Sequence, residues 1–185
     1  MMKLSRQDWC QAGLMALAEK GPEALKIDHL CDILAVTKGS FYHYFKHREA
    51  YIDELLAFWH AHYTQYLIEV LSPQDHVKQR IAQLSAAVSE ADHRTEVALR
   101  SWALSEPRVA EVVTAVDNKR LDYIAALLTE LGYNPVDSDL LAKLLYAQTL
   151  GCQQLGKRLS IEEWKAIDGW FMHWLGHEQR YFNEY

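Results

Sequence analysis

The chain has 185 residues and a mass of 21.4 kDa, enough for one large or two small domains. Half of its residues are hydrophobic, and only 4 Pro and 8 Gly are present, a composition that favours long helices around a substantial core. We find neither a charged-then-apolar leader nor an apolar run near the roughly 20 residues of a membrane span. We therefore expect a soluble, cytoplasmic protein rather than a membrane or secreted one.

The net charge of −6 is unevenly distributed. Residues 1–50 hold seven Lys or Arg and six Asp or Glu, a net charge of +1, whereas residues 51–185 hold twelve and nineteen, a net charge of −7. The acidity therefore lies outside the N-terminal segment. The three cysteines, Cys10, Cys31 and Cys152, are widely spaced and form no CxxC pair, so we interpret them as small buried residues.

A first helix is predicted to begin after Ser5. Ser5 and Asp8 have the spacing of a capping box, and Leu4 with Trp9 fits the hydrophobic staple around it. The inner stripe of this helix would be Cys10, Leu14 and Leu17. Lys20-Gly21-Pro22 should end it, because Gly suits the last turn and Pro cannot continue a helix.

Residues 26–51 are predicted to form two short helices joined by a tight turn. Ile27, Leu30, Cys31 and Leu34 recur at helical spacing on the first helix. Only Ala35 and Val36 link it to the second, a length typical of a helix-turn-helix unit. The Thr37 hydroxyl is suited to cap the second helix, which we predict over residues 38–45.

The second helix has two different sides. Phe41, Tyr44 and Phe45 should face inward; Gly39, Tyr42 and His43 should face outward, with Lys38 and Ser40 at the edges. Lys and Thr can bind phosphates, and Tyr and His can touch base edges. The outer side therefore suits a DNA duplex, although periodicity alone is equally compatible with an ordinary amphipathic hairpin.

The rest of the chain is also predicted to be helical. We predict a long helix from residue 46 or 47 to about residue 71, whose stripe includes Tyr51, Leu55, Trp59, Tyr63, Tyr66 and Val70. Further helices are predicted over about residues 74–90, 95–105, 107–131 and 137–155, and a last one after Ser160, which forms a second capping box with Glu163.

The run Ala35-Val36-Thr37-Lys38-Gly39-Ser40-Phe41-Tyr42-His43-Tyr44-Phe45-Lys46, followed by Arg48-Glu49-Ala50, resembles the N-terminal DNA-binding segment of TetR-family transcriptional regulators. The resemblance extends over residues 5–56. It implies an all-α fold of about nine helices, with a helix-turn-helix DNA-binding domain at residues 1–46 and a helical effector-binding and dimerisation domain at residues 47–185. It also implies a homodimeric repressor that binds a palindromic operator and is released by an unknown small-molecule effector.

The resemblance also assigns roles to residues. Thr37 and Lys38 should contact the DNA backbone, Lys38 also reaching a guanine, and Gly39, Ser40 and His43 should face bases. Tyr42 should touch a phosphate or a thymine methyl group, and Lys46 and Arg48 should bind phosphates. Three positions depart from the family pattern, two at the start of the first helix of the pair and one in the turn. Lys26 replaces a threonine and can still neutralise a phosphate, whereas Asp28 replaces an often basic residue and should not approach one. Ala35 stands where a turn glycine is usual, at a cost of about 1 kcal/mol.

For dimerisation we expect the last two helices, through Leu141, Leu144, Leu145, Gln148, Ile167, Phe171, Trp174 and Leu175, unless these residues form a thick internal core. Candidate effector-lining residues are Trp59, His62, Tyr63, Tyr66, Arg100, Trp102, Tyr146, Gln148 and Cys152, each of which could instead be core or surface. Arg100, if buried, needs Glu96, Asp117 or a ligand carboxylate as its partner.

Other classes find little support in the sequence. No Gly-rich phosphate loop, nucleophile elbow or HExxH motif occurs, so we expect neither an enzyme nor a cofactor. His60 and His62 point in different directions on a helix, so we expect no metal site. The remaining alternative is a helical protein-interaction module that does not bind an operator.

Overall fold

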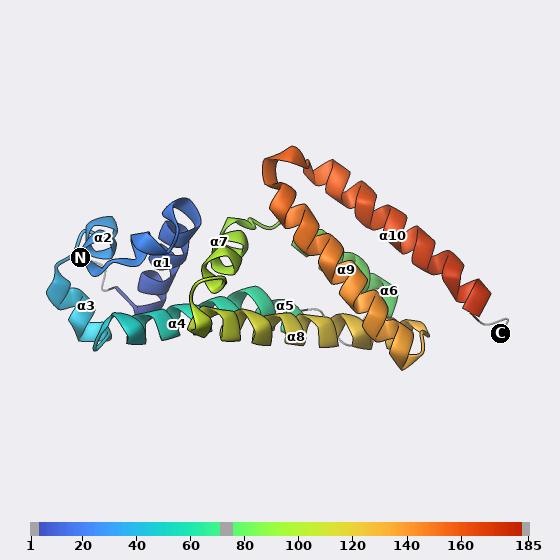
Figure 1. Ribbon diagram of the computed structural model, residues 1–185, viewed down its shortest axis with the longest axis horizontal. Coiled ribbons are helices and arrows are strands. Elements are labelled where there is room, and N and C mark those ends of the chain that lie inside the picture. Colours follow the sequence, from blue (N-terminus) through green and yellow to red (C-terminus); the bar gives the residue numbers. More distant parts are fainter. Residues whose placement is uncertain (1–3, 71–75, 183–185) are drawn as a thin grey trace. The chain divides into compact units, whose positions relative to one another are not determined.

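The computed structural model describes the backbone of residues 4–70 and 76–182 and the side chains as far as residue 174. All regular secondary structure within these ranges is helical, so the predicted all-α class is confirmed (Figure 1). The chain divides into two compact units. Unit 1 comprises Met1–Tyr66 and His93–Val116, and unit 2 comprises Leu67–Asp92 and Asp117–Tyr185. No helix in the described ranges is long and apolar enough to cross a membrane.

Helix α1 (Arg6–Lys20) begins and ends as the sequence predicts. The Ser5 hydroxyl accepts a hydrogen bond from the backbone N–H of Asp8 at 3.2 Å, and the Asp8 carboxylate accepts one from the backbone N–H of Ser5 at 2.6 Å. Gly21 ends the helix with a φ of 74°, a conformation that glycine adopts without strain. A 3-10 turn, Pro22–Leu25, then leads into the next helix.

Helices α2 (Ile27–Ile33) and α3 (Lys38–Tyr44) form the predicted helix-turn-helix pair. Ala35 adopts a φ of 52°, so the turn has left-handed geometry despite the missing glycine. The predicted cap on α3 is wrong, because the Thr37 hydroxyl makes no capping hydrogen bond; the Thr37 carbonyl instead accepts from the Ser40 N–H at 2.9 Å. Helix α3 also ends one residue earlier than predicted, because Phe45 is extended, with a φ of −132°.

The predicted long fourth helix is interrupted. It consists of α4 (Arg48–His60), a π-helical segment (Ala61–Gln65) and α5 (Tyr66–Val70), and its predicted end at residue 71 lies outside the described residues. After the buried Trp59 the next buried residue is Thr64, five positions on, whereas Tyr63 is 43% exposed. A π-helical turn holds more residues than an α-helical turn, so it rotates Tyr63 and Tyr66 out of the stripe that the sequence predicts.

Unit 1 has a single apolar core that extends beyond the helix-turn-helix. Trp9, Phe41 and Tyr51 pack with Leu99 of α7 (Arg94–Ala103) and Val109 of α8 (Pro107–Leu131). Helix α7 lies against α1, and α8 contributes its first half to the unit. The three N-terminal helices thus share their core with α4, α7 and the start of α8.

Unit 2 is built from α6 (Val77–Glu90), the second half of α8, α9 (Pro135–Leu155) and α10 (Ile161–Phe182). Helices α9 and α10 form an antiparallel hairpin (Figure 1) through a short 3-10 turn, Gly156–Arg158. Asn134 caps α9, which begins at Pro135, two residues before the predicted start at residue 137. The predicted Ser160–Glu163 capping box of α10 is confirmed, since the Ser160 hydroxyl accepts from the Glu163 N–H at 3.2 Å.

Candidate nucleic-acid interface

The inner side of α3 is fixed by aromatic packing. Phe41 is 0% exposed and Phe45 is 2% exposed. The ring of Phe41 lies 5.4 Å from that of Trp9 and 5.6 Å from that of Tyr51, both with edge-to-face geometry. Tyr44 is half-buried, and its hydroxyl donates to the Leu4 carbonyl. These contacts hold α3 in one rotational setting, because aromatic side chains bury large areas in specific geometries.

The outer side of α3 brings the predicted DNA-contacting residues together. Tyr42 is 56% exposed, and the exposed or half-buried set comprises Thr37, Lys38, Gly39, Ser40, His43 and Lys46. No protein atom other than the Thr37 hydroxyl, at 3.5 Å, lies near the position that a Cβ on Gly39 would take. A close approach by another backbone is therefore sterically open here.

Two of the predicted phosphate-binding lysines are paired with carboxylates. Lys38 Nζ lies 2.6 Å from Asp28 Oδ1, and Lys26 Nζ lies 2.8 Å from Glu23 Oε2. The hydrogen bond that Lys38 donates to Asp28 raises the pKa of Lys38, and the hydrogen bond that Lys26 donates to Glu23 lowers the pKa of Glu23. All four side chains are well exposed. Sequence reasoning missed these partners, although the unusual acid at position 28 could have signalled the first pair.

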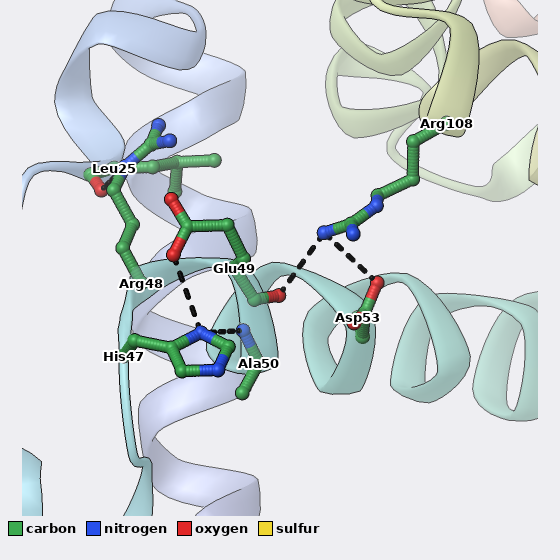
Figure 2. A network of polar contacts seen from close by, with 7 residues as sticks. All are labelled: Leu25, His47, Arg48, Glu49, Ala50, Asp53 and Arg108. Carbon is green, nitrogen blue, oxygen red and sulfur yellow. Dashed lines mark hydrogen bonds and ion pairs between the residues drawn. The ribbon is translucent and has the colours of Figure 1, made fainter.

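The first turn of α4 joins the helix-turn-helix to α8 (Figure 2). Arg48, a predicted phosphate ligand, is half-buried and donates from Nε to the Leu25 carbonyl at 3.1 Å. On the other side, Arg108 of α8 lies 3.2 Å from Asp53 Oδ1 and donates to the Glu49 carbonyl at 3.4 Å. Arg48 thus also has a structural contact, while its guanidinium NH2 groups remain available for other interactions.

His47 caps α4, since its Nδ1 accepts a hydrogen bond from the Ala50 N–H at 3.1 Å (Figure 2). The same nitrogen lies 3.2 Å from Glu49 Oε2. A neutral Nδ1 can accept from Ala50, whereas a protonated one can only donate, to Glu49. The contact seen at this nitrogen therefore depends on whether the imidazole is charged.

The predicted effector-lining residues of unit 1 do not share one environment. Trp59 is 0% exposed and Trp102 is 8% exposed, and both belong to the apolar core. Arg100 pairs with Glu96 at 2.8 Å, one of its predicted partners. The remaining candidates, His62, Tyr63 and Tyr66, are exposed or nearly so, and the His62 ring stacks on Phe58.

The candidates in unit 2 take part in two sets of polar contacts, one between α9 and α8 and one between α9 and α10. The Tyr146 hydroxyl donates to Asp117 Oδ1 at 2.7 Å and accepts from Arg120 at 3.2 Å. Gln148 donates to Asp168 Oδ1 at 3.2 Å and lies 3.1 Å from Cys152 Sγ. Effector contacts at these residues stay a prediction. In the described part of the chain, no group of three His, Cys, Asp or Glu side chains is placed to hold a metal ion.

A separate groove of about 480 Å³ runs between α1 and α2, and none of the predicted effector residues lines it. Its apolar wall includes Met15 and Ile33, which are 60% and 46% exposed. The groove lies in unit 1, on the N-terminal helices rather than in the C-terminal region where the effector was expected.

The predicted dimer residues of α9 and α10 fall on two faces. Leu141 and Leu145 pack against the internal cluster around Leu128, and Gln148 bonds within the unit. Ile167 and Phe171 are half-buried, whereas Leu144 and Trp174 are 43% and 44% exposed; the side chain of Leu175 lies outside the described residues. Further exposed apolar residues of α9 and α10, which the sequence analysis did not select, are Val136, Leu140, Leu155, Ile161 and Trp170.

Residues 10–55 match the family model described as bacterial regulatory proteins, tetR family. Three solved structures share the fold over nearly the whole chain. Escherichia coli NemR in its reduced form has a TM-score of 0.75 and 20% identity, covering 95% of this chain and 96% of that one. Salmonella enterica GusR has a TM-score of 0.70 and 20% identity, covering 94% and 95%. The transcriptional regulator FadR from Bacillus subtilis, in complex with stearoyl-CoA, has a TM-score of 0.67 and 15% identity, covering 92% and 97%. Among curated proteins, no sequence matches this chain.

The protein therefore has the fold of the TetR-family transcriptional regulators and carries the N-terminal domain of that family at residues 10–55. The resemblance carried by residues 35–46 is confirmed. Regulators of this family are not enzymes, in agreement with the expectation from the sequence.

Proposed function

We propose that this protein is a homodimeric transcriptional repressor, which binds a palindromic operator through α3 and is released by a small-molecule effector bound in its C-terminal region. The observation that carries the proposal is the division of α3 into two sides. Phe41 and Phe45 are buried, whereas Tyr42, His43 and Lys46 are exposed together. An exposed imidazole and phenol on one short helix, with an exposed ammonium two residues beyond its end, match the groups that contact base edges and phosphates in the major groove.

The charge distribution fits a few local contacts rather than a broad basic surface. Residues 1–50 carry a net charge of only +1, and the whole chain carries −6. Sequence-independent binding to DNA grows with the number of phosphates that a protein neutralises. This chain should therefore bind random DNA weakly and depend on base contacts from α3 for its affinity.

A dimer would supply the second recognition helix. Helix α9 presents Leu140 and Leu144, four residues apart, and α10 presents Trp170 and Trp174 with the same spacing; all four are at least 43% exposed. Exposed apolar stripes of this kind are typical of protein interfaces. Two copies packed through these helices around a two-fold axis could read two half-sites, provided that their α3 helices lie about 34–36 Å apart.

Effector release requires a path from the C-terminal region to α3, and α8 provides one. This helix contributes residues to both units, and its second residue, Arg108, contacts the Glu49 carbonyl in the first turn of α4 and the Asp53 carboxylate in the second. A movement of α8 would therefore act on the turn that directly follows the recognition helix. The binding of stearoyl-CoA by B. subtilis FadR supports a ligand role for this fold, but Arg100 is already neutralised by Glu96 and does not itself favour an acidic effector.

Binding-site selection on the purified protein with genomic fragments tests this function. We expect recovered sites with two-fold symmetry and half-sites one helical turn apart, bound by a dimer in sedimentation experiments. A gel shift of the recovered site should weaken steeply as salt rises. A protein that recovers no DNA, or a monomer that binds sites without symmetry, would contradict the proposal and favour an interaction module.

A further inference from the structure

The pair between Asp28 and Lys38 lies on the proposed DNA-binding face. Asp28 is in the first turn of α2, and Lys38 is the first residue of α3, so their contact bridges the two helices of the helix-turn-helix. Their charged atoms lie 2.6 Å apart, and the side chains are 69% and 61% exposed. The pair is therefore formed at the surface, where a DNA phosphate could reach the same ammonium group.

The energetics of an exposed pair allow such competition. Ion pairs between exposed side chains contribute little to stability because water and salt screen them, so a phosphate can displace Asp28 or share the three donors of the ammonium with it. In either case Asp28 places a negative charge next to the DNA backbone. Together Asp28 and Lys38 carry no net charge and should neutralise no phosphate.

We propose that Asp28 competes with DNA phosphates for Lys38 and so weakens the phosphate-dependent part of binding to random sequence and to the operator alike. This inference rests on the proposed function, because it assumes that α3 binds a duplex. At the operator, the base contacts proposed for Tyr42 and His43 still supply affinity after this loss, whereas random DNA offers only phosphates. Asp28 then sets how strongly DNA of any sequence is held, and it needs no contact with a base.

The test compares Asp28→Asn with the wild-type protein on a short mixed-sequence duplex and on the selected operator, over a range of salt concentrations. The Asn side chain keeps the shape of Asp but loses its charge. We expect affinity for the mixed-sequence duplex to rise about three- to tenfold, with a similar rise for the operator. The slope of log K against log salt should steepen by about 0.9, the value for one added phosphate contact. Adding Lys38→Met to Asp28→Asn should remove the steeper slope.

Asp139→Asn is a matched control. Asp139 pairs with Lys143 on α9 at 2.5 Å with comparable exposure, so its replacement makes the same change in net charge away from the helix-turn-helix. It should leave the salt slope unchanged. An unchanged slope and affinity in Asp28→Asn, or an equal change in Asp139→Asn, would overturn the inference while leaving operator binding intact. Failure of the wild-type protein to bind either duplex would instead contradict the proposed function itself.

Discussion

The buried hydroxyl of Tyr51 donates to the Trp9 carbonyl at 3.0 Å and so ties α4 to α1. The helices can approach this closely because residue 13 is a glycine. A Cβ at that position would lie 1.9 Å from the Tyr51 hydroxyl oxygen and 2.9 Å from Leu55 Cδ1. The missing Cβ at Gly13 therefore leaves the space that the Tyr51 hydroxyl occupies beneath the recognition helix.

Gly13→Ala should destabilise the protein by about 1–3 kcal/mol, because overpacking outweighs the better helix propensity of alanine. Chemical denaturation would measure this change. Tyr51→Phe removes the crowded oxygen, so it should cost less in the Gly13→Ala background than in the wild type. If the effects of the two substitutions on the free energy of unfolding were strictly additive, the proposed clash would be contradicted.

The turn between α2 and α3 offers a second test. Ala35 has a φ of 52°, a conformation in which a Cβ is strained, so Ala35→Gly should raise stability by about 0.5–1 kcal/mol. Ala57, on an exposed position of α4, is the matched control: Ala57→Gly should lower stability by about 1 kcal/mol. Thermal melting of both variants would show whether the two changes in stability have opposite signs. A loss of stability in both would mean that the turn is not strained.

One substitution on α3 and one just after it should weaken operator binding without unfolding the protein. Tyr42→Ala should lower affinity about tenfold if the ring contacts a base. Lys46→Ala should weaken binding to all sequences alike and reduce the salt slope by about one. Both side chains are exposed, so the melting temperature should not change. Met15→Ala on α1 is a control for loss of an exposed side chain, and an equal effect there would contradict a specific role for α3.

The cysteine thiols should be unreactive in the folded protein. Burial raises the pKa of Cys10 to about 12 and also raises the pKa of Cys31 and Cys152, so all three remain protonated near pH 8. A chromogenic disulfide reagent should modify them only after denaturant is added. Fast modification of folded protein would contradict this expectation.

The same pKa shifts affect stability at high pH. In the unfolded chain a thiol loses its proton near its ordinary pKa of 9.0, whereas in the folded protein Cys10 keeps it to about 12. The unfolded state therefore binds fewer protons between these values, and the free energy of unfolding should fall as pH rises through this window. Denaturation at several pH values would measure the slope, and Cys10→Ala should reduce it.

The oligomeric state can be tested on the exposed face of α9 and α10. Trp170 is 73% exposed, and Trp170→Glu or Leu144→Glu should shift the protein from dimer to monomer, because a charge in an apolar interface loses its solvation. Leu104→Glu is a matched control, since Leu104 is 90% exposed and follows α7 in unit 1. Sedimentation velocity would separate monomers from dimers. Dimers that persist in both interface variants would contradict the proposal that this face is the dimer interface.

Features set by neighbours in the chain could be predicted from the sequence. The capping boxes at Ser5 and Ser160, the turn at Ala35 and the two sides of α3 all depend on residues a few positions apart. Their physical causes are local, since a cap needs only the next turn of helix and a helical face needs only its period.

Features that depend on residues far apart in the sequence could not be predicted from it. The pairing of Lys38 with Asp28 requires the angle between two helices, and the rotation of Tyr63 out of its stripe requires the π-helical segment. The choice between Leu140 and Leu141 as the exposed residue of α9 depends on how that helix is turned against its neighbours. Adjacent residues on an apolar helix are indistinguishable by pattern when both are leucine.

The core of unit 1 has a consequence for anyone who wishes to exchange the DNA-reading part of this protein for another. Trp9 and Phe41 are buried in a cluster completed by Tyr51, Leu99 and Val109. A graft cut after residue 46 would leave those aromatic rings without half of their packing partners. A transplant that keeps its stability must carry two separate pieces of chain, Met1–Tyr66 and His93–Val116, and the recipient's own effector helices must be joined between and after them.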